Sequence, residues 1–596
     1  MTDYRAPVTD MRFTLEHVAG LDQLRNLEMF SHVDGDLITG VFEEAGRFFA
    51  EVVAPLARIG DEVGSVRNPD GSVTTPPGYK EAYRRFVEAG WPAVGFPEEF
   101  GGGGLPWGVA SALQEMLITA DMGFSLCAML TYGTVDMLLL HGSEEQKATY
   151  LENLVAARWS GTMVLTESHA GSDVGALSTK AVRAEDGTWR LTGTKIFITY
   201  GEHDLTENII HIVLARTPGA PPGTKGISCF IVPKYLVNPD GSLGERNDVQ
   251  CLSIEHKVGI HSSPTCMLSF GEASKGAVGY LIGEEHQGMR YMFTMMNEAR
   301  LSVGTEGLAI SERAFQQAAA YARERKQGRT VGGAAGEQAP IIKHPDVRRM
   351  LMMMRVNIAA MRGLIYRTAL ALDLARHAQD EEMRSQEEDL AAILTPICKG
   401  WATDLGVELT SIGIQIHGGS GFIEETGAAQ WWRDSRIAPI YEGTNGIMAQ
   451  DLVMRRIPLG GGMAIRRLLE MVLADAASLE GDLKPIGDRL TAATEACAEV
   501  AMTFGGWLLE GRYNDALAGA TPFLKMMGDT LGGWMLARGA RAAAAEPAGY
   551  DPKYLADRIA LAHFYAEHVL PTVKGRTAGC LAGAEGIFAI AEERLG

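Results

Sequence analysis

The spacing of hydrophobic residues changes twice along the chain. Over 36–161, apolar residues recur at helical spacing, and in GSEEQKATYL the residues Ser143 and Gln146 have the separation of a helix capping box. Over 162–283, runs of β-branched and aromatic residues are bounded by turn-forming residues, which predicts an antiparallel β unit. Helical spacing returns over 286–456, with long helices expected at 287–325, 343–377 and 385–414.

A glycine-rich break, IPLGGGM at 457–463, ends this helical stretch. The residues after it are again helical in pattern and rich in alanine, so they predict a further helical domain. The chain is therefore expected to be α+β and mostly α. The expected segments are an N-terminal arm (1–40), a helical domain (41–161), a β domain (162–285), a second helical domain (286–456) and a C-terminal helical extension (464–596).

Composition limits the classes of protein to which the chain can belong. With 596 residues, 46% of them hydrophobic, it is expected to form several packed domains. The net charge of −20 argues against a nucleic-acid role, because phosphate binding relies on a basic surface. We expect no secretory signal and no membrane span, since no apolar run is long enough. The seven scattered cysteines, without a CxxC pair, favour a reducing cytoplasm, and we expect no metal site.

One carboxylate stands in unusual surroundings. In RDSRIAPIYEGTNGIM (433–448), Glu442 lies between a tyrosine and a Gly-Thr pair, among residues that are mostly apolar or small. A carboxyl group in a dry apolar pocket has a raised pKa, which suits a general base near neutral pH. A structural glutamate at a helix boundary is the alternative interpretation.

Two motifs near the β region are candidates for ligand contacts. VLTESHAGSD (164–173) combines hydroxyl groups with small residues at a helix-to-strand junction, and such groups can contact a planar ring or a phosphate. A simple Ser-Gly-Asp turn is the alternative there. KIFITYG (195–201) places Phe197 and Thr199 on one face of a strand, as an aromatic surface beside a hydroxyl.

Two motifs in the second helical region add further candidates. RERKQGR (323–329) contains Arg325, whose guanidinium can bind a pyrophosphate. The alternative interpretation is that this basic stretch is simply the end of a surface helix. QIHGGSGF (415–422) follows a helix with glycines that allow another backbone or a phosphate to come close.

Taken together, these motifs resemble the acyl-CoA dehydrogenase family over about residues 40–456. The motifs that carry the resemblance, in the order and spacing of the family, are LTESHAGSD, KIFITYG, MNEAR, ERKQGR, QIHGGSGF and RDSRIAPIYEGTN. The resemblance implies an FAD-dependent enzyme with a helical domain, a β-barrel-like domain and a four-helix-bundle domain. The C-terminal helical extension would be additional.

The resemblance also implies roles for residues at matching positions. Those expected to contact FAD are Leu165, Thr166, Ser172, Phe197, Thr199, Arg325, Gln415, Gly419 and Thr444. Of these, Arg325, Gln415 and Gly419 match positions that hold the FAD of a neighbouring subunit. Those expected to contact the acyl-CoA are Ser172, Asn297, Arg300 and Gly443.

By the same resemblance, Glu442 is the catalytic base. It would remove the α-proton of the acyl thioester while the β-hydrogen leaves as hydride to the flavin. A hydrogen bond from the backbone N–H of Glu442 to the thioester oxygen would stabilise the developing enolate.

The substrate is less defined than the reaction. The first twenty residues and the C-terminal extension resemble a branch of the family that oxidises 3-(methylthio)propanoyl-CoA in dimethylsulfoniopropionate degradation, but that branch includes enzymes for other acyl-CoAs. A short- or medium-chain fatty acyl-CoA dehydrogenase and an acyl-CoA oxidase remain alternatives. A DNA-associated flavoprotein would need a basic extension, whereas residues 464–596 contain more acidic than basic residues.

Two further expectations follow from the resemblance. The electron acceptor would be an electron-transfer flavoprotein. A homodimer is expected, because in simpler family members two dimers pair through a surface of the second helical domain that the extension could cover.

Overall fold

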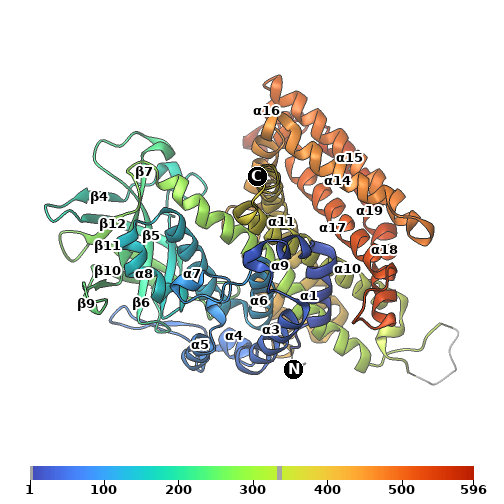
Figure 1. Ribbon diagram of the computed structural model, residues 1–596, viewed down its shortest axis with the longest axis horizontal. Coiled ribbons are helices and arrows are strands. Elements are labelled where there is room, and N and C mark those ends of the chain that lie inside the picture. Colours follow the sequence, from blue (N-terminus) through green and yellow to red (C-terminus); the bar gives the residue numbers. More distant parts are fainter. Residues whose placement is uncertain (1–3, 332–337) are drawn as a thin grey trace. The chain divides into compact units, whose positions relative to one another are not determined.

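The computed structural model describes residues 4–331 and 338–596, and most of these residues are helical (Figure 1). They form two compact units. The helical unit contains Met1–Arg47, Pro106–Thr119 and Arg300–Gly596, and the β-containing unit contains Phe48–Leu105 and Ala120–Ala299. The expected mostly helical α+β fold, with helices in addition after the glycine-rich break, is confirmed.

An eight-stranded sheet is the centre of the β-containing unit. Its strands are β3 (Trp159–Val164), β4 (Lys180–Arg183), β5 (Trp189–Thr199), β6 (Asn208–Arg216), β7 (Ile227–Pro233), β10 (Val249–Ile254), β11 (Thr265–Phe270) and β12 (Ala277–Leu281). Their order is β10-β11-β5-β12-β7-β6-β3, with β4 beside β5 and β6. The first residues of β5 pair with β12 and its last residues pair with β11, so β5 joins the two halves of this barrel-like region.

The sheet is not purely antiparallel, and the prediction was wrong on this point. β3 runs parallel to β6, with Trp159 opposite Asn208 and Val164 opposite Val213. The composition of a strand does not encode its direction, and parallel neighbours need only a long connection, which β4 and β5 supply here. Two short hairpins lie outside this sheet, β1 (Val66–Arg67) with β2 (Val73–Thr74) and β8 (Tyr235–Val237) with β9 (Leu243–Arg246).

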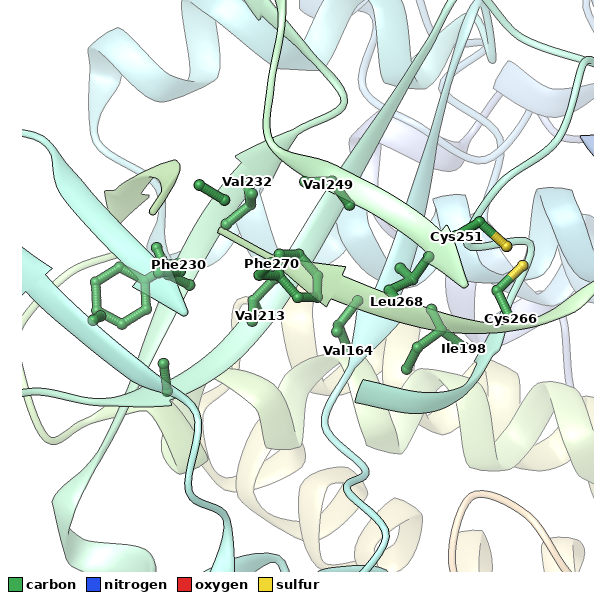
Figure 2. Packing of buried hydrophobic residues seen from close by; sticks show 14 of the residues in the cluster. Val164, Ile198, Val213, Phe230, Val232, Val249, Cys251, Cys266, Leu268 and Phe270 are labelled. Carbon is green, nitrogen blue, oxygen red and sulfur yellow. The ribbon is translucent and has the colours of Figure 1, made fainter. Parts of the chain in front are cut away.

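Apolar side chains from several strands meet in one core. Figure 2 shows Val164 from β3, Val213 from β6, Phe230 from β7, and Leu268 and Phe270 from β11 packed together. Each of them is at most 1% exposed. Burying one such side chain stabilises a fold by about 1.5–3 kcal/mol. The sheet is therefore a firm support for the loops at its edges.

Four helices complete the β-containing unit. They are α4 (Leu56–Val63), α5 (Tyr79–Glu88), α7 (Met122–His141) and α8 (Glu144–Val155). Helix α8 begins with the predicted capping box, because the backbone N–H of Gln146 donates to Ser143 Oγ at 3.2 Å and the backbone N–H of Ser143 donates to Gln146 Oε1 at 3.1 Å. The β1–β2 hairpin lies within 36–161, where only helices with polar breaks between them were predicted.

Helix α7 is long and apolar enough to cross a membrane by length and composition, contrary to the expectation that no apolar run is long enough. In the structure, 89% of its most apolar 18-residue window is buried inside the protein. The Thr131 hydroxyl of α7 accepts a hydrogen bond from the backbone N–H of Gly161 in β3 at 3.1 Å. Its apolar composition therefore matches a helix that protein surrounds on all sides.

Three long helices frame the helical unit. They are α9 (Gly288–Glu324), which belongs to this unit from Arg300 onward, α10 (Pro345–His377) and α11 (Glu381–His417), and they confirm the three predicted long helices. The shorter helices are α1 (Val8–Phe13), α2 (Asp22–Arg25), α3 (Gly35–Phe48), α6 (Trp107–Ala120), α12 (Ala428–Ser435) and α13 (Asn445–Asp451).

Helices α9 and α11 touch backbone to backbone. A Cβ atom added to Gly307 of α9 would lie 2.2 Å from the carbonyl oxygen of Ala402 in α11. Any larger residue at Gly307 would therefore push the helices apart. This close approach brings the side chains next to Gly307 and Ala402 into one small volume.

The C-terminal extension is helical, as predicted. Its helices are α14 (Met463–Ala477), α15 (Lys484–Leu509), α16 (Tyr513–Ala518), α17 (Ala520–Ala544), α18 (Pro552–His568) and α19 (Leu570–Cys580). The predicted break before it is confirmed, since Gly460, Gly461 and Gly462 have φ angles of 58°, 70° and 87°, a conformation that favours glycine.

The extension packs directly on the second helical domain. Trp401 of α11 is fully buried, and its indole Nε1 donates to Asp529 Oδ1 of α17 at 2.9 Å. Gly528 lies on the indole ring, where a Cβ atom would be 2.2 Å from Trp401 Cγ. Helix α17 therefore covers this face of α11 (Figure 1).

The N-terminal arm is attached to the last helices. The Phe13 ring meets the rings of Tyr550 and Tyr554 edge to face, with centroids 5.2 and 5.6 Å apart. Nearby, Arg12 Nε donates to the Tyr550 hydroxyl at 3.1 Å. These contacts tie the start of the helical unit to its end.

A buried ionic network lies between α6, α9 and α10. Arg362 is fully buried and donates from Nη2 to Glu115 Oε1 at 2.6 Å and to Glu312 Oε2 at 2.9 Å. The Tyr366 hydroxyl donates to Glu115 Oε2 at 2.7 Å. Buried charges are stable only when they are paired in this way. The network therefore fixes the register of these three helices.

Candidate active site

Glu442 lies in a strained turn between α12 and α13. Its φ angle is 56° and that of Gly443 is 88°, so two successive residues adopt the left-handed conformation. For a residue with a side chain this conformation costs on the order of 1–2 kcal/mol. Such strain persists only where the surroundings hold it, and it is common at functional sites.

Lys399 and Asn445 hold the far side of this turn. Lys399 Nζ donates to the carbonyl oxygen of Gly443 at 2.6 Å and to Asn445 Oδ1 at 2.8 Å. Asn445 Nδ2 donates in turn to Asp404 Oδ1 at 2.7 Å, and its backbone N–H donates to the carbonyl oxygen of Pro439 at 3.0 Å. Lys399 is fully buried, so α11 anchors the turn from inside the bundle.

The surroundings tune the Glu442 carboxyl group. Burial raises the pKa of Glu442 to about 7, although the positive charges of Arg300 and Lys399 oppose this rise. A carboxyl group with this pKa is ready to take up a proton near neutral pH.

Arg300 offers an unused donor beside the same turn. Its side chain is only 6% exposed, and its Nε is buried without a hydrogen-bond partner among the described residues. A Cβ atom added to Gly443 would lie 3.8 Å from Arg300 Nη2, so the guanidinium reaches the turn. A buried donor left unpaired carries a free-energy cost, which a bound polar group can remove. The structure thus brings Arg300, Glu442, Gly443 and Thr444 together in the helical unit.

Phe197 presents an aromatic face at the end of β5. Its side chain is 57% exposed, and its φ angle of 60° is unusual for a phenylalanine. The β5–β11 register shifts between Cys266 and Leu268, which is the place opposite Phe197. This bulge turns the ring out of the sheet while Thr199 keeps a place on the strand. The predicted pair of an aromatic ring and a hydroxyl therefore lies at the C-terminal end of β5.

The Leu165–Thr166 segment is fastened to β5. The backbone N–H of Ile196 donates to the carbonyl oxygen of Thr166 at 2.9 Å, and Lys195 Nζ donates to that of Leu165 at 2.8 Å. The fully buried Lys195 also donates to Glu167 Oε1 at 2.9 Å. Glu167 accepts further hydrogen bonds from the backbone and hydroxyl groups of residues 178 and 179.

Three candidates lie on the exposed side of the helical unit. Arg325 follows the last residue of α9, and Gln415 is in the last turn of α11, both with exposed side chains. Gly419 lies just beyond α11, and no atom would come within 4 Å of a Cβ added to it. The cation and the amide are both accessible, and groups of this kind can bind a phosphate group.

The remaining candidates, Ser172 and Asn297, are exposed residues of the β-containing unit. Ser172 lies in the loop after β3, and Asn297 lies in the part of α9 that belongs to this unit. The predicted site residues are therefore divided between the two units.

The residues that support the turn were not among the predicted site residues. Glu306, Lys399 and Asn445 are all buried around it. The available signal was a charged residue inside an apolar helical run, as in SVGTEGLAI and TPICKGWATDLG. A charged residue in such a run is expected to be buried, and a buried charge is rarely found unless it has a partner. The charge therefore indicates a polar contact inside the protein.

The residues present fit FAD. The exposed ring of Phe197 and the half-buried hydroxyl residue Thr199 suit a flavin ring, and the exposed Arg325 suits a pyrophosphate. The seven cysteines are all free and buried, so they do not compete with this interpretation.

Known protein families match nearly the whole chain. The matches are the acyl-CoA dehydrogenase N-terminal domain (41–158), the middle domain (162–273), the C-terminal domain (286–457) and an acetyl-CoA dehydrogenase C-terminal-like domain (465–591).

Two curated relatives match along their full length. The chain is 47% identical to 3-methylmercaptopropionyl-CoA dehydrogenase of Ruegeria pomeroyi, covering 95% of this chain and 96% of the relative. It is 36% identical to the broad-specificity linear acyl-CoA dehydrogenase FadE5 of Mycobacterium tuberculosis, covering 96% of each.

A solved structure shares the fold. It is an acyl-CoA dehydrogenase from Bacillus anthracis complexed with FAD, with a TM-score of 0.70 and 23% identity over 85% of this chain and 83% of that one. The predicted resemblance is thereby confirmed. The chain belongs to the acyl-CoA dehydrogenase family of FAD-dependent enzymes.

Proposed function

We propose that this acyl-CoA dehydrogenase oxidises 3-(methylthio)propanoyl-CoA to the 2-enoyl thioester, as a step of dimethylsulfoniopropionate degradation. The observation that carries the proposal is the full-length relation to the Ruegeria pomeroyi enzyme, at 47% identity. The relation covers 95% of this chain and 96% of the relative. The alternative with most support is a linear fatty acyl-CoA, because the Mycobacterium tuberculosis relative carries that description over the same length.

In this reaction Glu442 is the proposed base. Its carboxylate takes the proton from Cα of the thioester, and the electron pair of the broken C–H bond moves toward the carbonyl as an enolate. When bound, FAD would supply the acceptor for the hydride that leaves Cβ, and the product would hold a Cα=Cβ double bond. The pKa of about 7 lets Glu442 be ionised before the step and hold the proton after it.

Other residues of the chain bind and orient the reactants. We assign Arg300, Asn297, Ser172 and Gly443 to the acyl-CoA, with the backbone N–H of Glu442 directed at the thioester oxygen. We assign Leu165, Thr166, Ser172, Phe197, Thr199 and Thr444 to FAD. The unpaired Nε of the buried Arg300 supports the first assignment, and the exposed ring of Phe197 supports the second.

A panel of acyl-CoAs tests the substrate. The purified yellow enzyme is mixed anaerobically with 3-(methylthio)propanoyl-, butanoyl- or octanoyl-CoA, and the bleaching of the flavin is followed. We expect 3-(methylthio)propanoyl-CoA to give the highest ratio of limiting rate to half-saturating concentration. Faster reduction by octanoyl-CoA would move the assignment to a fatty acyl-CoA. Rapid reoxidation by air, without another acceptor, would favour an acyl-CoA oxidase.

Loss of a pyrophosphate contact is expected to weaken FAD binding. We expect Arg325→Ala and Gln415→Ala to lower the FAD retained per chain after dialysis, because phosphate charge would lose a charge-assisted partner. Glu381→Gln, at an exposed position on α11, is a control that should retain FAD fully. Equal FAD content in the control and both variants would contradict the assignment.

A homodimer is the proposed assembly, with an electron-transfer flavoprotein as the acceptor in the cytoplasm. The support for the dimer is that α17 already covers the face of α11 that carries Trp401. That face is then closed to a second dimer. Light scattering is expected to give a mass of two chains, and a mass of four chains would contradict the proposal.

A further inference from the structure

A second carboxyl group is buried next to the proposed base. Glu306 lies on α9 and is fully buried. Both of its carboxyl oxygens are within hydrogen-bonding distance of the Tyr441 hydroxyl, at 2.6 and 2.5 Å. Burying a carboxyl group is unfavourable, and an apolar side chain would pack there at lower cost. Its presence therefore needs another reason than packing.

The two ends of the turn are held by different helices. Tyr441, which directly precedes Glu442, is bound by Glu306 of α9. Gly443, which directly follows it, is bound through its carbonyl oxygen by Lys399 of α11. The close packing of α9 on α11 at Gly307 sets the distance between the two anchors. The strained conformation of Glu442 is thus fixed from both sides.

We propose that Glu306 is a positioning residue for Glu442, which fixes the Tyr441 hydroxyl and with it the entry to the turn, while Lys399 fixes the exit. This inference rests on the proposed role of Glu442 as the base. Glu306 acts through Tyr441 and needs no contact with the substrate. Precise placement matters here, because a misplacement of about 1 Å can lower a rate on the order of 100-fold.

The charge state of Glu306 has a consequence for the reaction. Burial raises the pKa of Glu306 to about 8 and the charge of Glu442 raises it too, whereas the Tyr441 hydrogen bond and Lys399 oppose the rise. Glu306 is therefore mostly protonated at neutral pH and ionises as the pH passes about 8. The charged groups that act on these two carboxyls are Arg300 from α9 and Lys399 from α11. Lys399 also interacts with Asp404 of α11, and Arg300 with Asp451, Arg455 and Arg456 from the segment after the turn.

An ionised Glu306 would place a second negative charge near the enolate. Like charges repel, so the parent enzyme is expected to lose activity as the pH rises above about 8. The expected loss is roughly three- to tenfold. A glutamine at the same position cannot ionise and would remove this loss.

Four variants of the full-length holoenzyme test the inference. The limiting rate of anaerobic flavin reduction is measured with 3-(methylthio)propanoyl- or butanoyl-CoA, whichever reduces the parent faster. Glu306→Gln keeps a carbonyl acceptor for Tyr441 and should stay within about threefold of the parent at pH 7. Glu306→Leu and Tyr441→Phe each remove the link and should lower the rate by about 10- to 100-fold. The double variant Glu306→Leu with Tyr441→Phe should be no slower than the slower of these two single variants. The reason is that each of the two substitutions breaks the same hydrogen bond between Glu306 and Tyr441.

Three results would overturn the inference. They are an unchanged rate in Tyr441→Phe, additive losses in the double variant, and an alkaline decline in Glu306→Gln equal to that of the parent. If Glu306→Leu does not fold, Tyr441→Phe and the pH profile of Glu306→Gln still decide. Glu408→Gln, an exposed position on α11, controls for the loss of one negative charge.

The Glu442→Gln variant distinguishes a failure of the proposed function from a failure of this inference. If Glu442→Gln were active, Glu442 would not be the base, and both the proposed function of this residue and the present inference would be wrong. An inactive Glu442→Gln beside unaffected Glu306 and Tyr441 variants would overturn only the inference.

Discussion

Replacing Glu442 with glutamine is expected to abolish flavin reduction by acyl-CoA while FAD stays bound. Glutamine keeps the shape of the side chain but cannot accept the α-proton. The loss should lie at or beyond the upper end of the roughly 10²- to 10⁴-fold credited to a general base. Anaerobic bleaching of the flavin measures the rate, and the flavin absorbance per chain measures FAD retention.

A control variant shows whether the loss of flavin reduction comes from the missing base or only from the loss of one negative charge. Glu425→Gln removes a negative charge at an exposed position of the preceding loop and should reduce its flavin as fast as the parent. A Glu442→Gln enzyme with the parent's rate would show that another group takes the proton. In that case Glu442 would be a structural residue.

Arg362→Met is expected to be the most destabilising single change in the helical unit. Glu115 and Glu312 would lose hydrogen bonds of 2.6 and 2.9 Å from the fully buried guanidinium. Removing one partner of a buried ionic network costs about 3–5 kcal/mol, because charge is left buried without compensation. Urea unfolding followed by far-UV circular dichroism measures the change in the free energy of unfolding.

A double variant separates lost packing from unpaired charge. Glu115→Gln with Arg362→Met removes one charge of each sign and should be more stable than Arg362→Met alone. If the two proteins unfold at the same urea concentration, the unpaired Glu115 carboxylate is not the source of the destabilisation. An unfolding midpoint for Arg362→Met equal to that of the parent would contradict the role of the network altogether.

Local patterns predicted the type and place of most elements. The helices predicted at 287–325, 343–377 and 385–414 are confirmed. They could be predicted because a helical hydrophobic period that continues over many residues is compatible with few structures other than a helix. The break at Gly460 to Gly462 was visible because glycine takes positive φ angles without strain. The parallel pairing of β3 with β6 was not visible, since strand direction is set by connections and not by composition. The boundaries of the five expected segments stay predictions.

The site was predicted unevenly for a related reason. Glu442 and Phe197 lie in the short motifs YEGT and KIFITYG. These two residues could therefore be recognised from local sequence alone. Glu306 and Lys399 belong to different helices and meet only because Gly307 lets α9 and α11 come together. No local pattern contains that approach.

The attachment of the N-terminal arm to the last helices constrains how the chain can be made. Arg12 and Tyr550 are joined across 538 positions of the sequence. A ribosome adds about 5–20 residues per second, so roughly half a minute to two minutes pass between the synthesis of the two partners. During that time the Phe13 ring lacks its edge-to-face partners Tyr550 and Tyr554. The helical unit can therefore close only after the residues around Tyr550 have been made, while the β-containing unit, whose segments all lie before Arg300, can fold first.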